Sequence, residues 1–242
     1  CKGVDIMKLW KVFYAIILAL FFLPAGHEVH AAQAVMPDTM AMEMARKSFV
    51  MHDENGKIYS VYIIGDNEMF VGAKHFTWLY GRDTDQVYKA YPYNAYLSAP
   101  GKKSAEIQYV QLFGKKMDVT RPDFINVTAP TYIGGVYVIQ GEDGQPDMLV
   151  TTKQMSFSFV DYRFFIIKNG ELRPMRFMYK DQSLRMAFIG VHKPARGLDD
   201  GTIAIPWFRQ GHIGAGKSGS FITVFMPDFT NMILISSYTI DD

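Results

Sequence analysis

Residues 211–227 read GHIGAGKSGSFITVFMP, and this stretch decides between two fold classes. Positions 211–218 match G-x-x-x-x-G-K-[ST], the pattern of a phosphate-binding loop, which needs a buried strand before it and a helix that begins at the Lys-Ser pair. Ser218 is followed instead by a glycine, the β-branched and aromatic run SFITVFM, and then Pro227. These residues favour a strand over a helix. The stretch therefore predicts an all-β protein, and nucleotide binding is kept only as an alternative hypothesis.

Strand-like runs extend outward from this stretch over most of the chain. Short β-branched and aromatic runs occupy residues 57–64, 69–73, 105–113, 134–140, 155–168, 173–180, 184–191, 202–208, 220–226 and 231–240. Asn55-Gly56 and Asn169-Gly170 predict tight hairpin turns, because glycine accepts the positive φ that such turns need. We expect further breaks at Gly134-Gly135, at 141–144 and at Pro227, and one short amphipathic helix at 42–51. This spacing of strands predicts antiparallel barrels or a sandwich.

Composition excludes several classes of protein. The 242 residues are 49% hydrophobic and carry a net charge of +1, which argues against a disordered chain and a general nucleic-acid-coating polycation. Cys1 is the single cysteine. A disulfide framework, a cysteine-based structural zinc site and a catalytic cysteine inside the fold are therefore excluded. We expect neither a metal nor a cofactor.

The N-terminal segment has the character of a membrane-seeking sequence. Residues 12–25, VFYAIILALFFLPA, carry no charge and follow Lys8 and Lys11. Counted from Leu9, the apolar stretch approaches the roughly 20 residues that a membrane-crossing helix needs. The pattern also suits a signal peptide that is cleaved after Ala31 or Ala32. We interpret residues 1–33 as a membrane anchor, with contact through residues 9–25, or as a precursor segment outside the catalytic fold.

The loop before the last two strand-like runs offers a nucleophile. Gly216-Lys217-Ser218-Gly219-Ser220 is a glycine-flanked turn that can expose a serine hydroxyl and direct backbone N–H groups at one point. A serine nucleophile needs a histidine base and an orienting carboxylate. Among six histidines, His75 follows a strand-like run, where a β-barrel presents functional side chains. Glu106 opens another run further along the chain.

Three sequence blocks resemble picornavirus-type 3C proteases. Residues 44–76 are similar to the family's N-terminal helix, hairpin, strand and V-x-x-H element, and residues 104–124 to the stretch in which an acidic residue opens a strand. Residues 214–225, GAGKSGSFITVF, are similar to the A-G-x-C-G-G nucleophile loop. The middle, about 130–200, matches only as general β structure. The resemblance implies two chymotrypsin-like, six-stranded antiparallel barrels with the active site between them, and cleavage of a viral polyprotein.

By this resemblance, His75 is the general base, Glu106 the orienting acid and Ser218 the nucleophile. The backbone N–H groups of Gly216, Lys217 and Ser218 would form the oxyanion hole, each contributing about 3 kcal/mol of transition-state stabilisation. Asp118 is the alternative acid. The family usually has cysteine at the nucleophile position, so Ser218 is either a natural serine variant or an inactivating substitution.

Substrate selection departs from the family as well. The strand after the nucleophile lacks the family's G-x-H motif, and Tyr238 occupies the nearest position. A tyrosine hydroxyl can still donate to a glutamine carbonyl, but another side-chain preference fits equally well. His212 and Ile213 are expected on the opposite wall of the substrate site. The cluster Lys115, Lys116 and Arg121 is similar to the family's RNA-binding segment, although a solvated charged turn explains it better.

The sequence thus predicts a precursor segment at 1–33, an N-terminal barrel at 34–128 and a C-terminal barrel at 129–242. The Gln33-Ala34 bond is a candidate junction for self-processing. We expect the enzyme in the host-cell cytoplasm, associated with intracellular membranes in its precursor form. The alternatives are a secreted β-rich serine protease or binding module with a signal peptide, and the nucleotide-binding protein considered above.

Overall fold

Strands dominate the part of the protein that the structure describes, which confirms the all-β prediction. The computed structural model describes residues 34–72, 84–113, 122–128, 134–155, 159–179, 183–191, 193–209 and 219–241, which lie in the compact unit Ala32–Asp242. Within these ranges there is one helix, α2, and the strand pairings are antiparallel except that β13 pairs with β19 in parallel.

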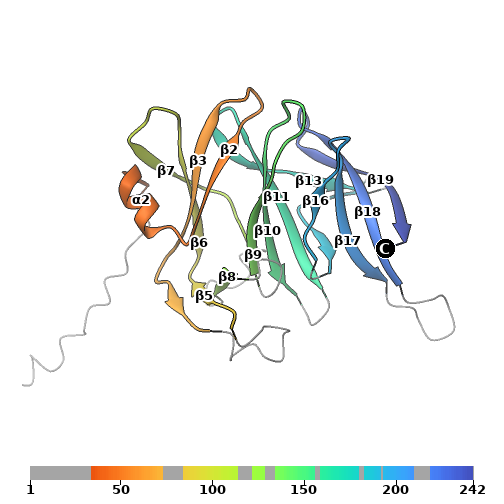
Figure 1. The fold of residues 1–242 in the computed structure, drawn as a ribbon, viewed down its shortest axis with the longest axis horizontal. Coiled ribbons are helices and arrows are strands. Elements are labelled where there is room, and N and C mark those ends of the chain that lie inside the picture. The colour runs from red at the N-terminus through yellow and green to blue at the C-terminus, as the bar shows by residue number, and fades with distance from the viewer. Residues whose placement is uncertain are drawn as a thin grey trace, which may run out of the picture. The chain divides into compact units, whose positions relative to one another are not determined.

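The strands form four hydrogen-bonded sheets (Figure 1). The N-terminal sheet has the order β1-β7-β6-β3-β2, with bounds Val35–Pro37, Ser104–Gln108, Tyr93–Ser98, Ile58–Gly65 and Lys47–His52. A small sheet has the order β4-β5-β8, with bounds Met69–Phe70, Val87–Ala90 and Asp123–Asn126. The central sheet has the order β12-β11-β10-β9, with bounds Glu171–Pro174, Val160–Lys168, Met148–Gln154 and Gly134–Ile139, and β15 (Phe188–Gly190) also pairs with β11. The C-terminal sheet has the order β14-β13-β19-β18-β17-β16, with bounds Leu184–Arg185, Arg176–Met178, Ile233–Asp241, Gly219–Asp228, Ile203–Arg209 and Arg196–Gly197.

Strand β11 of the central sheet is buried on both faces, since all its residues from Val160 to Ile167 are buried. In Figure 1 it lies between β3 and β17. Phe165 and Ile167 of β11 pack with residues of the N-terminal sheet, such as Val61. Phe164 and Ile166 point to the other face and pack with residues of the C-terminal sheet. Successive side chains of a strand point to opposite faces, so the part of a strand that lies between two apolar cores is apolar at consecutive positions. This explains the continuous run FFII in the sequence.

Helix α2, Asp38–Met44, covers the outer face of the N-terminal sheet through Ala41. The prediction of a helix at 42–51 was therefore wrong in position, because residues 47–52 form strand β2 and pair with β3. Pro37 precedes the helix and Asp38 lies in its first turn, where a negative charge is favourable. Residues 47–51 have a helical pattern in the sequence, but their pairing with β3 outweighed it.

Two predicted turns are confirmed. Asn169 and Gly170 have φ values of 53° and 77° and join β11 to β12 as a two-residue hairpin loop. Gly56, with φ of 73°, lies in the turn between β2 and β3.

Gly134-Gly135 lies at the start of strand β9, where the predicted run 134–140 also begins. A Cβ at Gly134 would lie 2.1 Å from the carbonyl oxygen of Phe124, so this close approach requires glycine. The break predicted at Pro227 is wrong, because Pro227 lies inside β18 and pairs with Leu234 of β19. Pairing of β18 with β17 ends before it, at Phe225.

The 211–218 segment connects two neighbouring strands of the C-terminal sheet. Strand β17 ends at Arg209, which pairs with Gly219 at the start of β18. Strand β18 begins at Gly219, so a strand follows Ser218 directly, as predicted. A phosphate-binding loop would need a helix over these residues that follow its Lys-Ser pair.

The described strands form open sheets, and none of these sheets closes into a barrel. No helix within the described ranges is long and apolar enough to cross a membrane. The boundaries predicted at 33/34 and 128/129 stay predictions.

Candidate functional site

Most of the predicted site residues lie outside the described residues. These are His75, Asp118, His212, Ile213, Gly216, Lys217 and Ser218, together with the basic residues Lys115, Lys116 and Arg121. Glu106 and Tyr238 are described. The described parts of the predicted site are therefore these two residues and the strands that lead into and out of the segments 73–83 and 210–218. Glu106 and Tyr238 lie on different sheets.

Glu106 lies on β7, between two partner strands. It pairs with Leu97 of β6 on one side and with Val35 of β1 on the other. Its neighbour Ala105 is buried beneath α2, so the Glu106 side chain points to the opposite face of the sheet, the face on which Leu97 packs. The carboxylate is exposed there and available to a partner.

Tyr238 lies on β19 and pairs with Val224 of β18, the strand that begins after Ser218. Its side chain is 47% exposed. The tyrosine side chain is thus accessible on this surface.

The strands that carry the His75 and Ser218 segments belong to one continuous row of neighbours. The row begins at β5, which is paired to β4 before the 73–83 segment, and passes to β8 through the pair Val87 and Asn126. Phe124 of β8 lies against Gly134 of β9, which pairs with Lys153 of β10.

From β10 the row continues toward the C-terminal sheet. Lys153 pairs with Asp161 of β11, and Asp161 pairs with Ile189 of β15. The N–H of Val191 donates to the carbonyl oxygen of Pro206 in β17, 3.1 Å away. Strand β17 then leads into the 210–218 segment. Strands of three sheets therefore lie next to one another between the two segments.

Four charged side chains, which we call the ionic cluster, lie along this row: Asp123, Lys153, Asp161 and Arg163. Lys153 Nζ donates to Asp123 Oδ1 at 3.1 Å, and Arg163 Nε lies 3.7 Å from Asp161 Oδ2. Arg163 Nη1 also donates to the carbonyl oxygen of Gln111 at 3.4 Å. Asp161 and Arg163 are each 8% exposed. Asp161 Oδ1 and Arg163 Nε have no hydrogen-bond partner among the described residues.

The chemistry of the ionic cluster is set by its loss of solvent. Burial raises the pKa of Asp161, and Arg163 opposes this shift only in part. Burial likewise raises the pKa of Asp123, against the opposing effect of Lys153. The cluster has two carboxylates and two cations. It therefore links side chains of β8, β10 and β11 without placing a net charge between the two predicted catalytic segments.

A buried carboxylate that the sequence did not single out lies next to the His75 segment. Asp85 is 3% exposed and follows residues 73–83 closely. Its Oδ2 accepts a hydrogen bond of 3.0 Å from Asn126 Nδ2, and Asn126 is fully buried. In the sequence only the short run VYKA after Gln86, with its β-branched and aromatic residues, hinted at a strand here. Asp85 is therefore a second candidate, beside Glu106, for an acid that orients His75.

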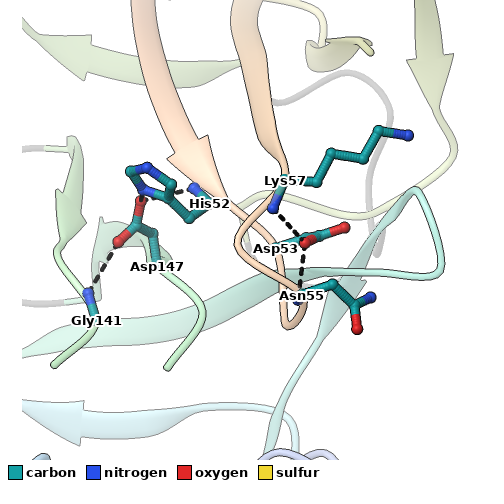
Figure 2. Close-up of polar contacts among 6 residues, drawn as sticks. All are labelled: His52, Asp53, Asn55, Lys57, Gly141 and Asp147. Carbon is teal, nitrogen blue, oxygen red and sulfur yellow. Dashed lines mark hydrogen bonds and ion pairs between the residues drawn. The ribbon is translucent and has the colours of Figure 1, made fainter. Parts of the chain in front are cut away.

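Sequence reasoning also missed the pairing of His52 with Asp147 (Figure 2). Asp147 Oδ2 accepts from the His52 backbone N–H at 2.7 Å and lies 2.9 Å from His52 Nδ1, while Oδ1 accepts from Gly141 N–H at 2.8 Å. Asp147 is 2% exposed, whereas the His52 side chain is 44% exposed. The two residues are 95 positions apart in the chain, so no local sequence pattern predicts their pairing.

The His52–Asp147 pair has the histidine and carboxylate of a catalytic triad, but it lies at the opposite end of β10 from the ionic cluster. Asp147 directly precedes Met148, the first residue of β10, and Lys153 is near its last. Six residues of strand span about 20 Å. We therefore assign this pair to joining the β2–β3 hairpin to the turn at 141–147.

Within the described ranges, no group of three or more His, Cys, Asp or Glu side chains is arranged to hold a metal ion. Models of known protein families, the curated proteins and the solved structures were each compared with this chain, and none matches it.

Proposed function

We propose that this protein is a chymotrypsin-like endopeptidase of the viral 3C type that cleaves a polyprotein through His75, Glu106 and Ser218. One observation supports this proposal best. Both predicted catalytic segments connect neighbouring antiparallel strands, the His75 segment between β4 and β5 and the Ser218 segment between β17 and β18. Loops between strands of a rigid sheet are where an all-β enzyme carries its reactive groups.

The proposed reaction is acyl transfer. Ser218 Oγ attacks the carbonyl carbon of the scissile bond and its proton passes to His75. His75 then gives this proton to the departing amine, and the acyl group stays on Ser218 as an ester. Water, activated by His75, hydrolyses the ester and restores the serine. The N–H groups of Gly216, Lys217 and Ser218 stabilise the oxyanion that forms in each half of the reaction.

Labelling with a sulfonyl fluoride tests the nucleophile and its base. The parent chain is expected to be labelled at Ser218, and His75→Ala to lose at least about 100-fold in labelling rate, since serine depends on its base. His52→Ala is the matched control, because His52 is partly exposed at the other end of β10. Equal labelling of the His75→Ala and His52→Ala chains would contradict the proposal.

A peptide assay separates a natural serine enzyme from an inactivated one. The substrate is a peptide spanning residues 27–40, which contains the Gln33-Ala34 bond. If the parent is inactive and Ser218→Cys cleaves the peptide, Ser218 replaces a catalytic cysteine. Failure of both chains to cleave it, together with absence of labelling, would refute the peptidase.

The same assay identifies the orienting acid. Glu106→Gln is expected to lower kcat by about 100-fold or more if Glu106 fixes the His75 ring, because the wrong tautomer is then favoured. Asp85→Asn preserves the shape of the buried side chain and tests the second candidate. Glu171→Gln, on an exposed carboxylate, is the control for a change of charge alone. Asp118→Asn tests the remaining acid.

Two six-stranded barrels, at 34–128 and 129–242, belong to this proposal. So does a membrane-associated precursor held through residues 9–25 in the host-cell cytoplasm. Incubation of the full chain should produce a new N-terminus at Ala34. Cleavage after Ala31 or Ala32 in a secreting cell would instead favour a secreted protein, and magnesium-dependent ATP or GTP binding abolished by Lys217→Ala would favour a nucleotide-binding protein.

A further inference from the structure

Strand β1 begins directly after the proposed processing junction and pairs with the strand that carries Glu106. The carbonyl oxygen of Ala34 accepts a hydrogen bond from Ile107 N–H at 2.8 Å, and Val35 pairs with Glu106. At the other end of β1, Asp38 N–H donates to the carbonyl oxygen of Lys103 at 2.9 Å. The first residues after Gln33 are therefore part of the sheet and hold the backbone on both sides of Glu106.

One side chain anchors this strand. Met36 is 4% exposed and packs with Ala41, Tyr62, Tyr96 and Ala105, whereas Val35 is 54% exposed. A strand of three residues with a single buried anchor is a weakly held edge, and edges of this kind open locally before the rest of the fold. Without β1, strand β7 would itself become the edge and Ile107 N–H would lose its partner.

Docking of β1 and cleavage of the junction compete for the same backbone. A protease binds its substrate as an extended segment, commonly through main-chain hydrogen bonds. Residues 34–37 cannot pair with β7 and occupy an active site at the same time. The bond before Ala34 can thus be cut only while β1 is released.

We infer that Met36 is a positioning residue that keeps β1 on β7, so that it protects the Gln33-Ala34 junction and holds Glu106 in place after cleavage. This inference rests on the proposed function. It predicts opposite effects of loosening β1: the junction is cut faster, while the enzyme that results works more slowly on other substrates.

The experiment uses the full chain with whichever residue at position 218, serine or cysteine, cleaves the peptide substrate. It compares this chain with its Met36→Ala, Met36→Leu and Met40→Ala variants. Met40 is an exposed methionine on α2, so its substitution is the matched control, and Met36→Leu restores apolar volume. The same variants in a Ser218→Ala chain report hydrogen exchange at the Ile107 amide without self-cleavage.

For Met36→Ala we expect about tenfold faster exchange at Ile107 and about tenfold faster cleavage at Gln33-Ala34. We also expect kcat on the peptide substrate to fall about tenfold with little change in KM, because Glu106 acts after binding. The acid limb of the kcat/KM profile should move to lower pH, since His75 would lose a carboxylate that favours its charged form. Met36→Leu and Met40→Ala should resemble the parent.

Unchanged exchange at Ile107 in Met36→Ala would overturn this inference alone. Faster exchange with unchanged junction cleavage and unchanged kcat would do so as well, because β1 would then be a structural strand only. Absence of any peptidase activity in both the parent and the Ser218→Cys chain would overturn the proposed function, and with it the coupling to Glu106, whatever the exchange result.

Discussion

The two ends of strand β10 are joined to the N-terminal part of the protein by different chemistry. At its beginning, Asp147 accepts hydrogen bonds from two backbone N–H groups and pairs with an exposed histidine (Figure 2). At its end, Lys153 and the neighbouring Arg163 meet carboxylates in the ionic cluster, and two buried polar atoms lack hydrogen-bond partners among the described residues. At the first end the buried carboxylate of Asp147 has hydrogen-bond partners on both oxygens. At the second end the buried carboxylates depend on nearby cations.

This difference teaches what each end contributes. Backbone N–H groups held by a fixed turn stabilise a buried carboxylate without a second charge having to lose its water. Buried ion pairs offset their own desolvation, so they add little stability but are sensitive to the loss of one partner. The ionic end lies on the row of strands between the two proposed catalytic segments, and we expect changes there to disturb both stability and activity.

The largest effect is expected from Arg163→Met, which leaves Asp161 as a buried carboxylate without its cation. The free energy of unfolding at pH 7 should fall by about 3–5 kcal/mol, measured by urea denaturation. Arg173→Met is the matched control, because the Arg173–Glu171 pair is more than half exposed and should contribute less than about 1 kcal/mol. Similar losses in both variants would remove the distinction between the two environments.

The pH dependence of the Arg163→Met defect sharpens the same test. Burial raises the pKa of Asp161 above its ordinary value of 3.8, so the folded protein still holds this proton at pH values where the unfolded chain has released it. The stability contributed by the protonated acid is lost as pH rises through the folded pKa. The defect should therefore be largest at neutral pH and shrink below that pKa; a defect independent of pH would contradict this account.

Asp147→Ala comes next, at the satisfied end. It leaves the N–H groups of His52 and Gly141 without the buried carboxylate that accepts from them, and the expected loss of unfolding free energy is about 2–3 kcal/mol. Asp200→Ala, on an exposed turn, removes a carboxylate that accepts from Thr202 and should destabilise the protein much less than Asp147→Ala. Thermal unfolding of the two variants measures both losses of stability, and equal losses would contradict this prediction.

Lys153→Met should have a smaller effect, about 1–2 kcal/mol at pH 7, because Lys153 is about one-third exposed and Asp123 keeps some contact with solvent. Removal of the ammonium group raises the pKa of Asp123 further, since the lysine opposes the effect of burial. The loss should again disappear at pH values below the folded pKa of Asp123. Denaturation curves at several pH values measure this loss, and a loss that persists below the folded pKa of Asp123 would contradict the prediction.

His52→Ala should have the smallest effect, about 1 kcal/mol or less, because Asp147 retains both backbone donors and the histidine side chain is 44% exposed. Peptidase activity of this variant should equal that of the parent. A loss of activity comparable to that of His75→Ala would mean that the His52–Asp147 pair, and not the His75 segment, supplies the base.

Several features of the fold were predictable because they depend on neighbouring residues. Glycine and asparagine at 169–170 accept positive φ in a two-residue turn, whatever the rest of the chain does. The run after Ser218 is β-branched and aromatic, and it forms β18. Tyr238 and Glu106 were both expected on strands, and they lie on β19 and β7.

Other features depend on contacts between distant residues. Residues 47–52 form a strand because β3 lies beside them, and Gly134 is required by the approach of Phe124. Strand β10, with the mixed sequence MLVTTKQ, gave no clear signal because its apolar half and its polar half meet different surroundings. Leu149 packs in one core, Met148 and Val150 pack in the other, and Lys153 near the end of the strand joins the ionic cluster.

The sequence by itself determined the all-β class, the hairpin turns and the strand after Ser218, because each rests on the conformational preferences of adjacent residues. Only the tertiary structure decided that β11 is buried on both faces, that Asp147 meets His52, that Asp85 lies buried beside Asn126 and that β1 pairs with Glu106. These contacts join residues far apart in the chain, and their formation depends on which sheets pack together, a choice that local preferences leave open.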